Sequence, residues 1–407
     1  MILYLIADAP LRFAFLIFKY FPFGGVQRDM LRIANDCAAS GHEVTIYTGE
    51  WRGDKPANTN LAGSIKVVLL KSSGLFNHQR HQSLIKAMAN EVLLAKPDLV
   101  VGFNRMPGLD AYYAADPCFV ERAHAERGWW YRLSGRYRFF AASEKAVMST
   151  DTHCQVLLLT SHDQAVFQHW YGTQDHRFHV LPPSIPAQRF ANIDRASARH
   201  HLRQEFGLQQ DADVMLMVGS AFVRKGLDRA IVALAQLPEA IRNNTWLLAV
   251  GEDEAEPMIA IARQHGVADR VFIVAEGRAD VPDLMMGADV LVHAARSELA
   301  GIVIIEALTA GLPVIVTGVC GYAGHVSDAG AGKVLPAPYE QADFNQALAE
   351  MLSSPNREQW HAAGLRYTAN ILANTSATVE ADLLTQFAND KNATSNATAT
   401  RTNSKKG

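Results

Sequence analysis

Short apolar runs alternate with longer helical patterns along most of the chain, and this rhythm restricts the fold more than any other feature. The first half contains, in turn, strand-like and helical segments at 13–18, 26–40, 42–48, 78–95, 98–103, 155–160 and 178–181. Strands that alternate with helices of this kind form parallel sheets with helices on both faces. We therefore expect an α/β fold.

A proline-rich segment divides this rhythm into two series. Pro182, Pro183 and Pro186 suit neither a helix interior nor a central strand, so residues 181–186 are the predicted linker. The second series comprises 214–219, 226–237, 246–251, 254–265, 271–274, 281–286, 289–292, 302–311 and 313–316. Two such series predict two Rossmann-like, doubly wound parallel-sheet domains that face a cleft, with ligands beyond the carboxyl ends of the strands.

The domain boundaries follow from these segments. We place the first domain at 11–182 and the second at 183–366. A C-terminal helix at 367–390 is expected to pack back on the first domain. The last residues, 391–407, are rich in Asn, Ala, Thr, Ser and Lys, so we expect a disordered tail there.

Composition excludes several classes of protein. Hydrophobic residues make up 49% of the 407 residues and charged residues 19%, the balance of a soluble folded protein. A net charge of −3 argues against a globally basic nucleic-acid-binding protein, and four cysteines without a C-x-x-C pair fit a reducing compartment. Asp8, Pro10 and Arg12 interrupt the apolar start before it reaches the length of a membrane span. We expect residues 1–10 to be a dispensable extension.

Two glutamates separated by seven residues, Glu298 and Glu306, form the most specific motif. We expect Glu298 on a loop and Glu306 one turn into the helix that follows. The backbone N–H groups at the start of that helix would seat a diphosphate, and they belong to Gly301, Ile302 and Val303. A carboxylate one turn into the helix can accept both hydroxyls of a ribose. The same spacing also arises by chance, but the helix that ends at Gly311 and the strand that starts at Pro313 favour the functional interpretation.

Two further loops carry binding signals at the ends of strands. Arg224 and Lys225 follow a strand that ends at Gly219, and we expect them to open the next helix and to neutralise a leaving diphosphate in place of a metal ion. Gly24 and Gly25 lie between the first strand and the first helix, where glycines let the backbone approach a ligand closely. Alone, each pattern is also typical of an ordinary turn.

Together these motifs resemble those of retaining glycosyltransferases of the GT-B fold, family four, and more narrowly those of the bacterial lipopolysaccharide core glucosyltransferases. The similar stretches are 19–29, 102–110, 114–116, 219–226 and 298–321, which with their spacing span about residues 11–385. The resemblance implies the catalytic residues Asp116, Glu298, Arg224 and Lys225. It implies the donor-binding residues Gly24, Gly25, Arg189, Arg224, Lys225, Glu298, Gly301, Ile302, Val303 and Glu306.

The activity implied by this resemblance is transfer of a hexose with retention of configuration. The donor would be UDP-glucose, which is a substrate rather than a cofactor, and the acceptor an inner-core heptose of lipopolysaccharide on the cytoplasmic face of the inner membrane. No metal is expected, since Asp211 and Asp213 fit a turn before a strand and the histidines show no zinc-like pattern. Two alternatives remain, a transferase with galactose, N-acetylhexosamine or another acceptor, and a sugar-nucleotide isomerase of the same architecture.

Residues 122–140 combine arginines with aromatic residues. The segment holds five arginines, one acid and six aromatic residues, a composition that suits the headgroup layer of an anionic membrane if it forms one helix. Such a segment could also stack on RNA bases, or its aromatic residues could be core and its arginines solvated. A lipid-linked acceptor favours the membrane, so we expect peripheral membrane association and no nucleic-acid partner.

Overall fold

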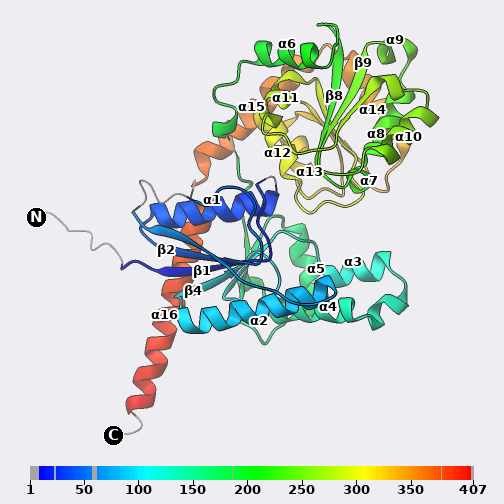
Figure 1. Ribbon diagram of the computed structural model, residues 1–407. Helices are drawn as coiled ribbons and strands as arrows, with labels where there is room; N and C mark the ends of the chain where they lie inside the picture. Colours follow the sequence, from blue (N-terminus) through cyan, green and yellow to red (C-terminus); the bar gives the residue numbers. More distant parts are fainter. Residues whose placement is uncertain (1–8, 23, 57–61, 186, 377, 405–407) are drawn as a thin grey trace, which may run out of the picture. The chain divides into compact units, whose positions relative to one another are not determined.

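The computed structural model describes residues 9–22, 24–56, 62–185, 187–376 and 378–404, and the predicted extension at 1–10 therefore lies almost entirely outside the described residues. The chain divides into two compact units, Met1–Leu181 with Ser376–Gly407, and Pro182–Thr375. Figure 1 shows that each unit contains its own sheet with helices around it. The predicted α/β fold with two parallel sheets is confirmed.

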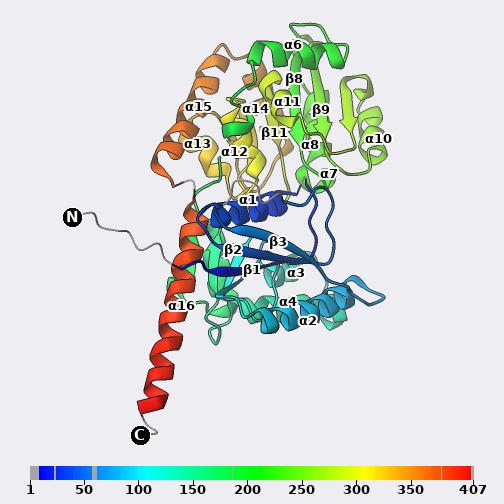
Figure 2. The ribbon, with the colours of Figure 1, turned by 60° about the vertical axis from the view of Figure 1, so that its left-hand side comes forward.

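The first unit is built on a parallel sheet with the strand order β3-β2-β1-β4-β5-β6-β7. Its described strands are β1 Arg12–Ile17, β2 Glu43–Thr48, β3 Ser64–Leu69, β4 Leu99–Gly102, β5 Ala111–Ala114, β6 Gln155–Leu158 and β7 Phe178–Val180. Its described α-helices are α1 Gly25–Ala39, α2 Asn77–Ala95, α3 Phe119–Glu126, α4 Gly135–Met148, α5 His162–Tyr171 and α16 Val379–Ser404. In Figures 1 and 2, α1 covers one face of this sheet and α2 and α4 the other.

Local sequence explains the main elements of this unit. β1 is buried at every position after its first residue, as expected of a strand covered on both faces. Gly41, with φ 92°, ends the turn after α1 in the left-handed conformation that glycine favours. The sequence did not predict β3, whose burial pattern is mixed, or β5, whose Ala-Tyr-Tyr-Ala stretch contains no β-branched residue.

The second unit has the strand order β10-β9-β8-β11-β12-β13, again with parallel pairing throughout its described ladders. Its strands are β8 Asp213–Val218, β9 Thr245–Val250, β10 Val271–Val274, β11 Val290–His293, β12 Val314–Thr317 and β13 Gly332–Leu335. Its described α-helices are α6 Arg195–Glu205, α7 Phe222–Lys225, α8 Leu227–Ala235, α9 Glu239–Arg242, α10 Glu256–Gln264, α11 Val281–Gly287, α12 Ile302–Thr309, α13 Ala323–Ala329, α14 Gln341–Ser353 and α15 Arg357–Asn374.

The strand order places a ligand-binding edge in the second unit. The first two connections step outward from β8 to β9 and β10, and the next returns to β11 on the other side of β8. Loops that follow β8 and β11 therefore diverge at a topological switch point, where open α/β sheets bind their ligands. The loop with Arg224 and Lys225 follows β8, and the loop with Glu298 follows β11.

The end of the chain differs from its prediction. Residues 367–390 do not form one helix, since α15 ends at Asn374 in the second unit and α16 begins at Val379 in the first. Instead of a disordered tail from Lys391, helix α16 continues to Ser404, so this prediction is wrong. Lys391 Nζ lies 2.6 Å from Asp110 Oδ2, which fixes the helix to the first unit beyond residue 390.

A second correction concerns residues 122–140, which do not form one helix. The segment passes from α3 through a 3-10 helix, Trp129–Leu133, into α4. Gly128 and Ser134 flank the 3-10 helix in extended conformations, and Ser134 caps α4 by accepting a hydrogen bond from Tyr137 N. Among the helices in the described ranges, none is long and apolar enough to cross a membrane.

Candidate functional site

The loops that follow β8 and β11 are joined through their backbones. Arg296 N donates a hydrogen bond to Arg224 O at 2.8 Å, and Arg224 Nη1 donates to Ser297 O at 3.1 Å. Gly226 makes this approach possible, because a Cβ there would lie 2.0 Å from the carbonyl oxygen of Ala294. The tertiary fold thus brings the basic pair to Glu298 across more than seventy residues of sequence.

The position of the basic pair differs from the prediction that it opens a helix. Arg224 and Lys225 end the single-turn helix α7, and Gly226 separates them from α8. Gly226 has φ 81°, a left-handed conformation that separates α7 from α8, so the two cations end a helical turn instead of opening the helix predicted at 226–237. The break turns both cations toward the loop of Glu298.

Glu298 is a largely buried carboxylate that two cations face. Its carboxylate forms an ion pair with Lys225, and Arg224 Nη1 lies 3.4 Å from Glu298 Oε2. The side chains of Lys225 and Glu298 are 12% and 13% exposed, whereas that of Arg224 is 46% exposed. Burial raises the pKa of Glu298, but the neighbouring His293 and Lys225 lower it to about 2 overall. The carboxylate is therefore ionised at neutral pH.

His293, the last residue of β11, is a member of this cluster that the sequence did not single out. Its side chain is 0% exposed, and its Nε2 lies 3.6 Å from Glu298 Oε2. Burial lowers the pKa of His293, and the charges of Lys225 and Arg224 act in the same direction. One feature of the sequence could have identified His293: it is a polar residue at the carboxyl end of an otherwise apolar strand, and ligands bind beyond the carboxyl ends of such strands.

The second glutamate lies one turn into α12, as predicted. Helix α12 begins at Ile302 after Gly301, whose φ of 84° requires the left-handed conformation. Glu306 is 5% exposed and accepts a hydrogen bond from Arg189 Nη1. The sequence predicted Arg189 near the donor but did not predict that it pairs with Glu306. The two glutamates of the motif thus have separate cationic partners within the second unit.

The remaining predicted residues lie in the first unit, beyond the carboxyl ends of its strands. Gly24 is the N-cap of α1 and Gly25 its first residue, while Phe23 beside them lies outside the described residues. Asp116 follows β5, where Arg105 Nη2 donates to the carbonyl oxygens of Asp116 and Pro117 at 2.5 Å each.

A buried ion pair supports this loop. Arg105 Nη1 lies 2.8 Å from Glu144 Oε1, and the side chain of Glu144 is fully buried. Glu144 also accepts hydrogen bonds from the backbone N–H groups of Phe119 and Val120 at the start of α3. A buried pair with these additional hydrogen bonds fixes the backbone at Asp116, and sequence reasoning missed both of its members.

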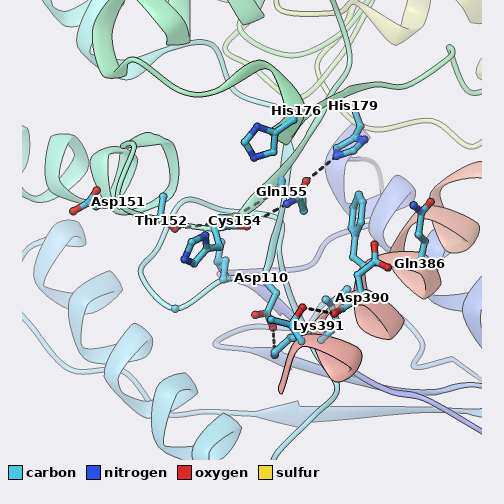
Figure 3. A pocket seen from close by; sticks show the side chains of 16 residues that line it. Asp110, Asp151, Thr152, Cys154, Gln155, His176, His179, Gln386, Asp390 and Lys391 are labelled. Atoms are coloured by element: carbon cyan, nitrogen blue, oxygen red, sulfur yellow. Dashed lines mark hydrogen bonds and ion pairs between the residues drawn. The ribbon is translucent and has the colours of Figure 1, made fainter. Parts of the chain in front are cut away.

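A cavity of about 950 Å³ lies in the first unit away from all of these residues. Figure 3 shows it between α16 and the amino ends of the strands, with Asp110, Gln155, His179 and Lys391 around it. Asp110 Oδ2 already accepts hydrogen bonds from Val100 N and Lys391 Nζ, and His179 Nε2 lies 2.9 Å from Gln155 Oε1. None of the predicted site residues lines this cavity, so it is not the predicted donor site.

The basic and aromatic residues at 122–140 divide into two groups. All five arginines are exposed, and so are Trp129 and Trp130, which stack with their ring centroids 3.5 Å apart. Tyr137, Phe139 and Phe140 instead pack against the core of the first unit. The core interpretation therefore holds for α4, while the 3-10 helix presents apolar and basic side chains to solvent.

Comparisons with known proteins agree with this geometry. The family described as "Glycosyltransferase Family 4" matches residues 23–189, and the family described as "Glycosyl transferases group 1" matches residues 198–366. The lipopolysaccharide glucosyltransferase WaaG of Escherichia coli K12 is 43% identical over 348 residues, which cover 85% of this chain and 91% of that protein.

Solved structures extend the similarity to the fold. A crystal structure of WaaG, described as a glycosyltransferase involved in lipopolysaccharide biosynthesis, gives a TM-score of 0.84 at 40% identity and covers 92% of this chain and 99% of that one. The structure of Anabaena HepE in complex with UDP-glucose gives a TM-score of 0.69 at 18% identity, with 92% and 98% covered, a likeness of fold alone.

Proposed function

Because the chain belongs to the glycosyltransferases of family four, with the GT-B fold, we propose that it transfers glucose from UDP-glucose to an inner-core heptose of lipopolysaccharide, with retention of configuration. The observation that carries this proposal is the cluster of Arg224, Lys225 and Glu298 at the switch point of the second sheet. The name of the 43% identical relative from Escherichia coli, a lipopolysaccharide glucosyltransferase, supports glucose as the sugar and lipopolysaccharide as the acceptor.

The basic pair is suited to support the departure of a diphosphate. In the structure Lys225 and Arg224 face Glu298, so an entering diphosphate would compete with that carboxylate for both cations. Donors already fixed by the fold stabilise charge that develops on the leaving group without further reorganisation. The N-terminus of α12 at 301–303 would add backbone N–H groups. With these cations present, we propose that the reaction needs no metal ion.

The two glutamates are proposed to bind different parts of the donor. Glu306, one turn into α12 and paired with Arg189, is placed for the ribose hydroxyls. Glu298, on the preceding loop, is placed for the sugar that is transferred. Asp116, with Gly24 and Gly25, would act from the first unit, which we also propose to hold the acceptor.

The chemical step that we propose has no covalent enzyme intermediate. The bond between the anomeric carbon and the diphosphate oxygen breaks, and the acceptor hydroxyl oxygen forms the new bond on the same face of the sugar. The proton of that hydroxyl passes to an oxygen of the departing diphosphate. Lys225 and Arg224 would carry most of the catalysis by stabilising the negative charge on that group.

The acceptor suggests where the protein works. We propose that residues 122–140 bind the anionic cytoplasmic face of the inner membrane, since exposed arginines beside exposed tryptophans suit a headgroup layer. Co-sedimentation with vesicles of phosphatidylglycerol and phosphatidylcholine should rise with the anionic fraction and fall with salt. Replacing Arg132, Arg136 and Arg138 with Gln should weaken vesicle binding. Arg263→Gln removes an exposed arginine of α10 and is the matched control, which should bind as the unaltered protein does. Vesicle binding that depends neither on the anionic lipid fraction nor on the salt concentration would contradict the proposal.

A donor screen tests the proposed reaction. Purified protein is incubated with lipopolysaccharide that lacks the first core glucose and with UDP-glucose, UDP-galactose, UDP-N-acetylglucosamine or GDP-mannose, and the product mass is measured. We expect the mass of one hexose to be added with UDP-glucose and only when acceptor is present. Preferential transfer from another donor would correct the sugar, and conversion of a sugar nucleotide without acceptor would favour the isomerase.

A further inference from the structure

His293 has a feature that the proposed mechanism has not used. The ring is fully buried at the end of β11, yet neither of its nitrogens has a hydrogen-bond partner among the described residues. A buried polar group without a partner destabilises the fold relative to one that is hydrogen-bonded. An apolar side chain would fill the same space without this cost, so the imidazole at this position requires an explanation.

The carboxylate of Glu298 lies beside the ring. Its Oε2 lies 3.6 Å from His293 Nε2, a few tenths of an ångström beyond the usual range of an N–H···O hydrogen bond. The same oxygen is the one that Lys225 and Arg224 approach. In the structure, therefore, Lys225 and Arg224 form ion pairs with the carboxylate of Glu298, and His293 lies just beyond hydrogen-bond distance from it.

Binding of the donor would change this balance of charge. Under the proposed function the diphosphate draws Lys225 and Arg224 toward itself, and Glu298 then loses the cations that face it. Burial raises the pKa of a carboxylate when no cation faces it, so Glu298 would take up a proton more readily once the two cations have turned to the diphosphate. A neutral imidazole with a free N–H can supply the missing hydrogen bond without adding charge.

We infer that His293 is a positioning residue for Glu298, which donates from Nε2 to the carboxylate when the donor diphosphate engages Lys225 and Arg224. This inference rests on the proposed function, and it assigns His293 no contact with substrate. The charged groups that face the ring are Lys225 and Arg224 at the end of α7 and Glu298 on the loop before α12. Cys320, after β12, pairs with Glu298 in an isolated parallel β-bridge.

Two substitutions separate the ring nitrogens. The amide nitrogen of His293→Gln can replace Nε2, whereas that of His293→Asn reaches only the position of Nδ1. His293→Leu removes both donors. Val292→Ala, at the neighbouring buried position that points to the opposite face of the sheet, is the control for lost packing.

The measurement is proton uptake on donor binding. UDP-glucose is titrated calorimetrically into each full-length protein at about pH 6, where an unpartnered buried carboxylate is partly protonated, in buffers of different ionisation enthalpy. We expect little uptake for the unaltered protein, His293→Gln and Val292→Ala, and clear uptake for His293→Asn and His293→Leu. With acceptor present, the acidic limb of kcat should move to higher pH by on the order of one unit in the latter two.

The outcomes distinguish this inference from the proposed function. Donor binding with equal proton uptake in all variants would overturn the role of His293 and leave the transferase intact. Little proton uptake in His293→Asn together with clear uptake in His293→Gln would overturn the assignment of the hydrogen bond to Nε2. Failure of the unaltered protein to bind UDP-glucose or UDP would contradict the proposed function and the inference together. If His293→Leu does not fold, the difference in proton uptake between His293→Gln and His293→Asn still tests the role of Nε2.

Discussion

Replacement of Lys225 by methionine tests the proposed leaving-group site most directly. The change keeps the apolar stem of the side chain and removes only the charge. A pair of unit charges about 4 Å apart gains about 4 kcal/mol at an effective dielectric constant of about 20, and about 1 kcal/mol in water. Lys225 is 12% exposed and Arg224 46%, so the larger figure applies to Lys225 and the smaller to Arg224.

The ion pair with Glu298 reduces this gain. Lys225 must exchange its carboxylate for the diphosphate, and Glu298 keeps only part of its stabilisation afterwards. We therefore expect a net loss of about 3 kcal/mol for Lys225→Met, equivalent to a fall in kcat on the order of 10²-fold. Arg224→Met should cost about 1 kcal/mol, roughly a fivefold fall.

The assay is steady-state transfer of labelled glucose from UDP-glucose to lipopolysaccharide that lacks the core glucose. Donor is varied to saturation so that kcat and KM are separated, and thermal unfolding shows whether each variant is folded. Arg263→Met removes an exposed cation of α10 that pairs with Glu256, and it should leave both constants unchanged. A folded Lys225→Met protein with kcat within about threefold of the unaltered one would refute the diphosphate assignment, because transition-state stabilisation lost from a buried cation must appear in kcat.

Three further predictions follow from the structure. Glu306→Gln should weaken UDP binding by about 1.5–3 kcal/mol in calorimetry, whereas Glu298→Gln should lower kcat without weakening UDP binding, because the carboxylate competes with the diphosphate for Lys225 and Arg224; the reverse result would exchange the two roles. Arg105→Met should lower the melting temperature by about 10 °C, because it leaves the buried carboxylate of Glu144 unpaired, and should reduce kcat through Asp116 without changing UDP affinity; an unchanged melting temperature would contradict the importance of this pair. Turnover should be the same after treatment with excess EDTA as before it, and loss of activity that Mg²⁺ or Mn²⁺ restores would show that the basic pair does not replace a metal.

Local sequence patterns were enough to predict the fold class and the location of the binding loops. Apolar runs such as that of β1 and the glycine after α1 report local backbone preferences, which depend on neighbours in sequence. The placement of Glu306 one turn into a helix followed from the same kind of local pattern. Elements with weak local signals, such as the four-residue strand β5, were missed for the same reason.

The tertiary structure decided which of these residues meet. Lys225 and Glu298 lie 73 residues apart in sequence, and they pair only because β8 and β11 are neighbours in the sheet. His293 belongs to no motif, and Arg105 lies in the similar stretch 102–110 without having been predicted as a site residue; the importance of both appears only from what surrounds them after folding. Helix α16 likewise continues past residue 390, where Lys391 pairs with Asp110 of the first unit. Local patterns record backbone preference, whereas charge pairing and burial depend on contacts that the folded chain alone creates.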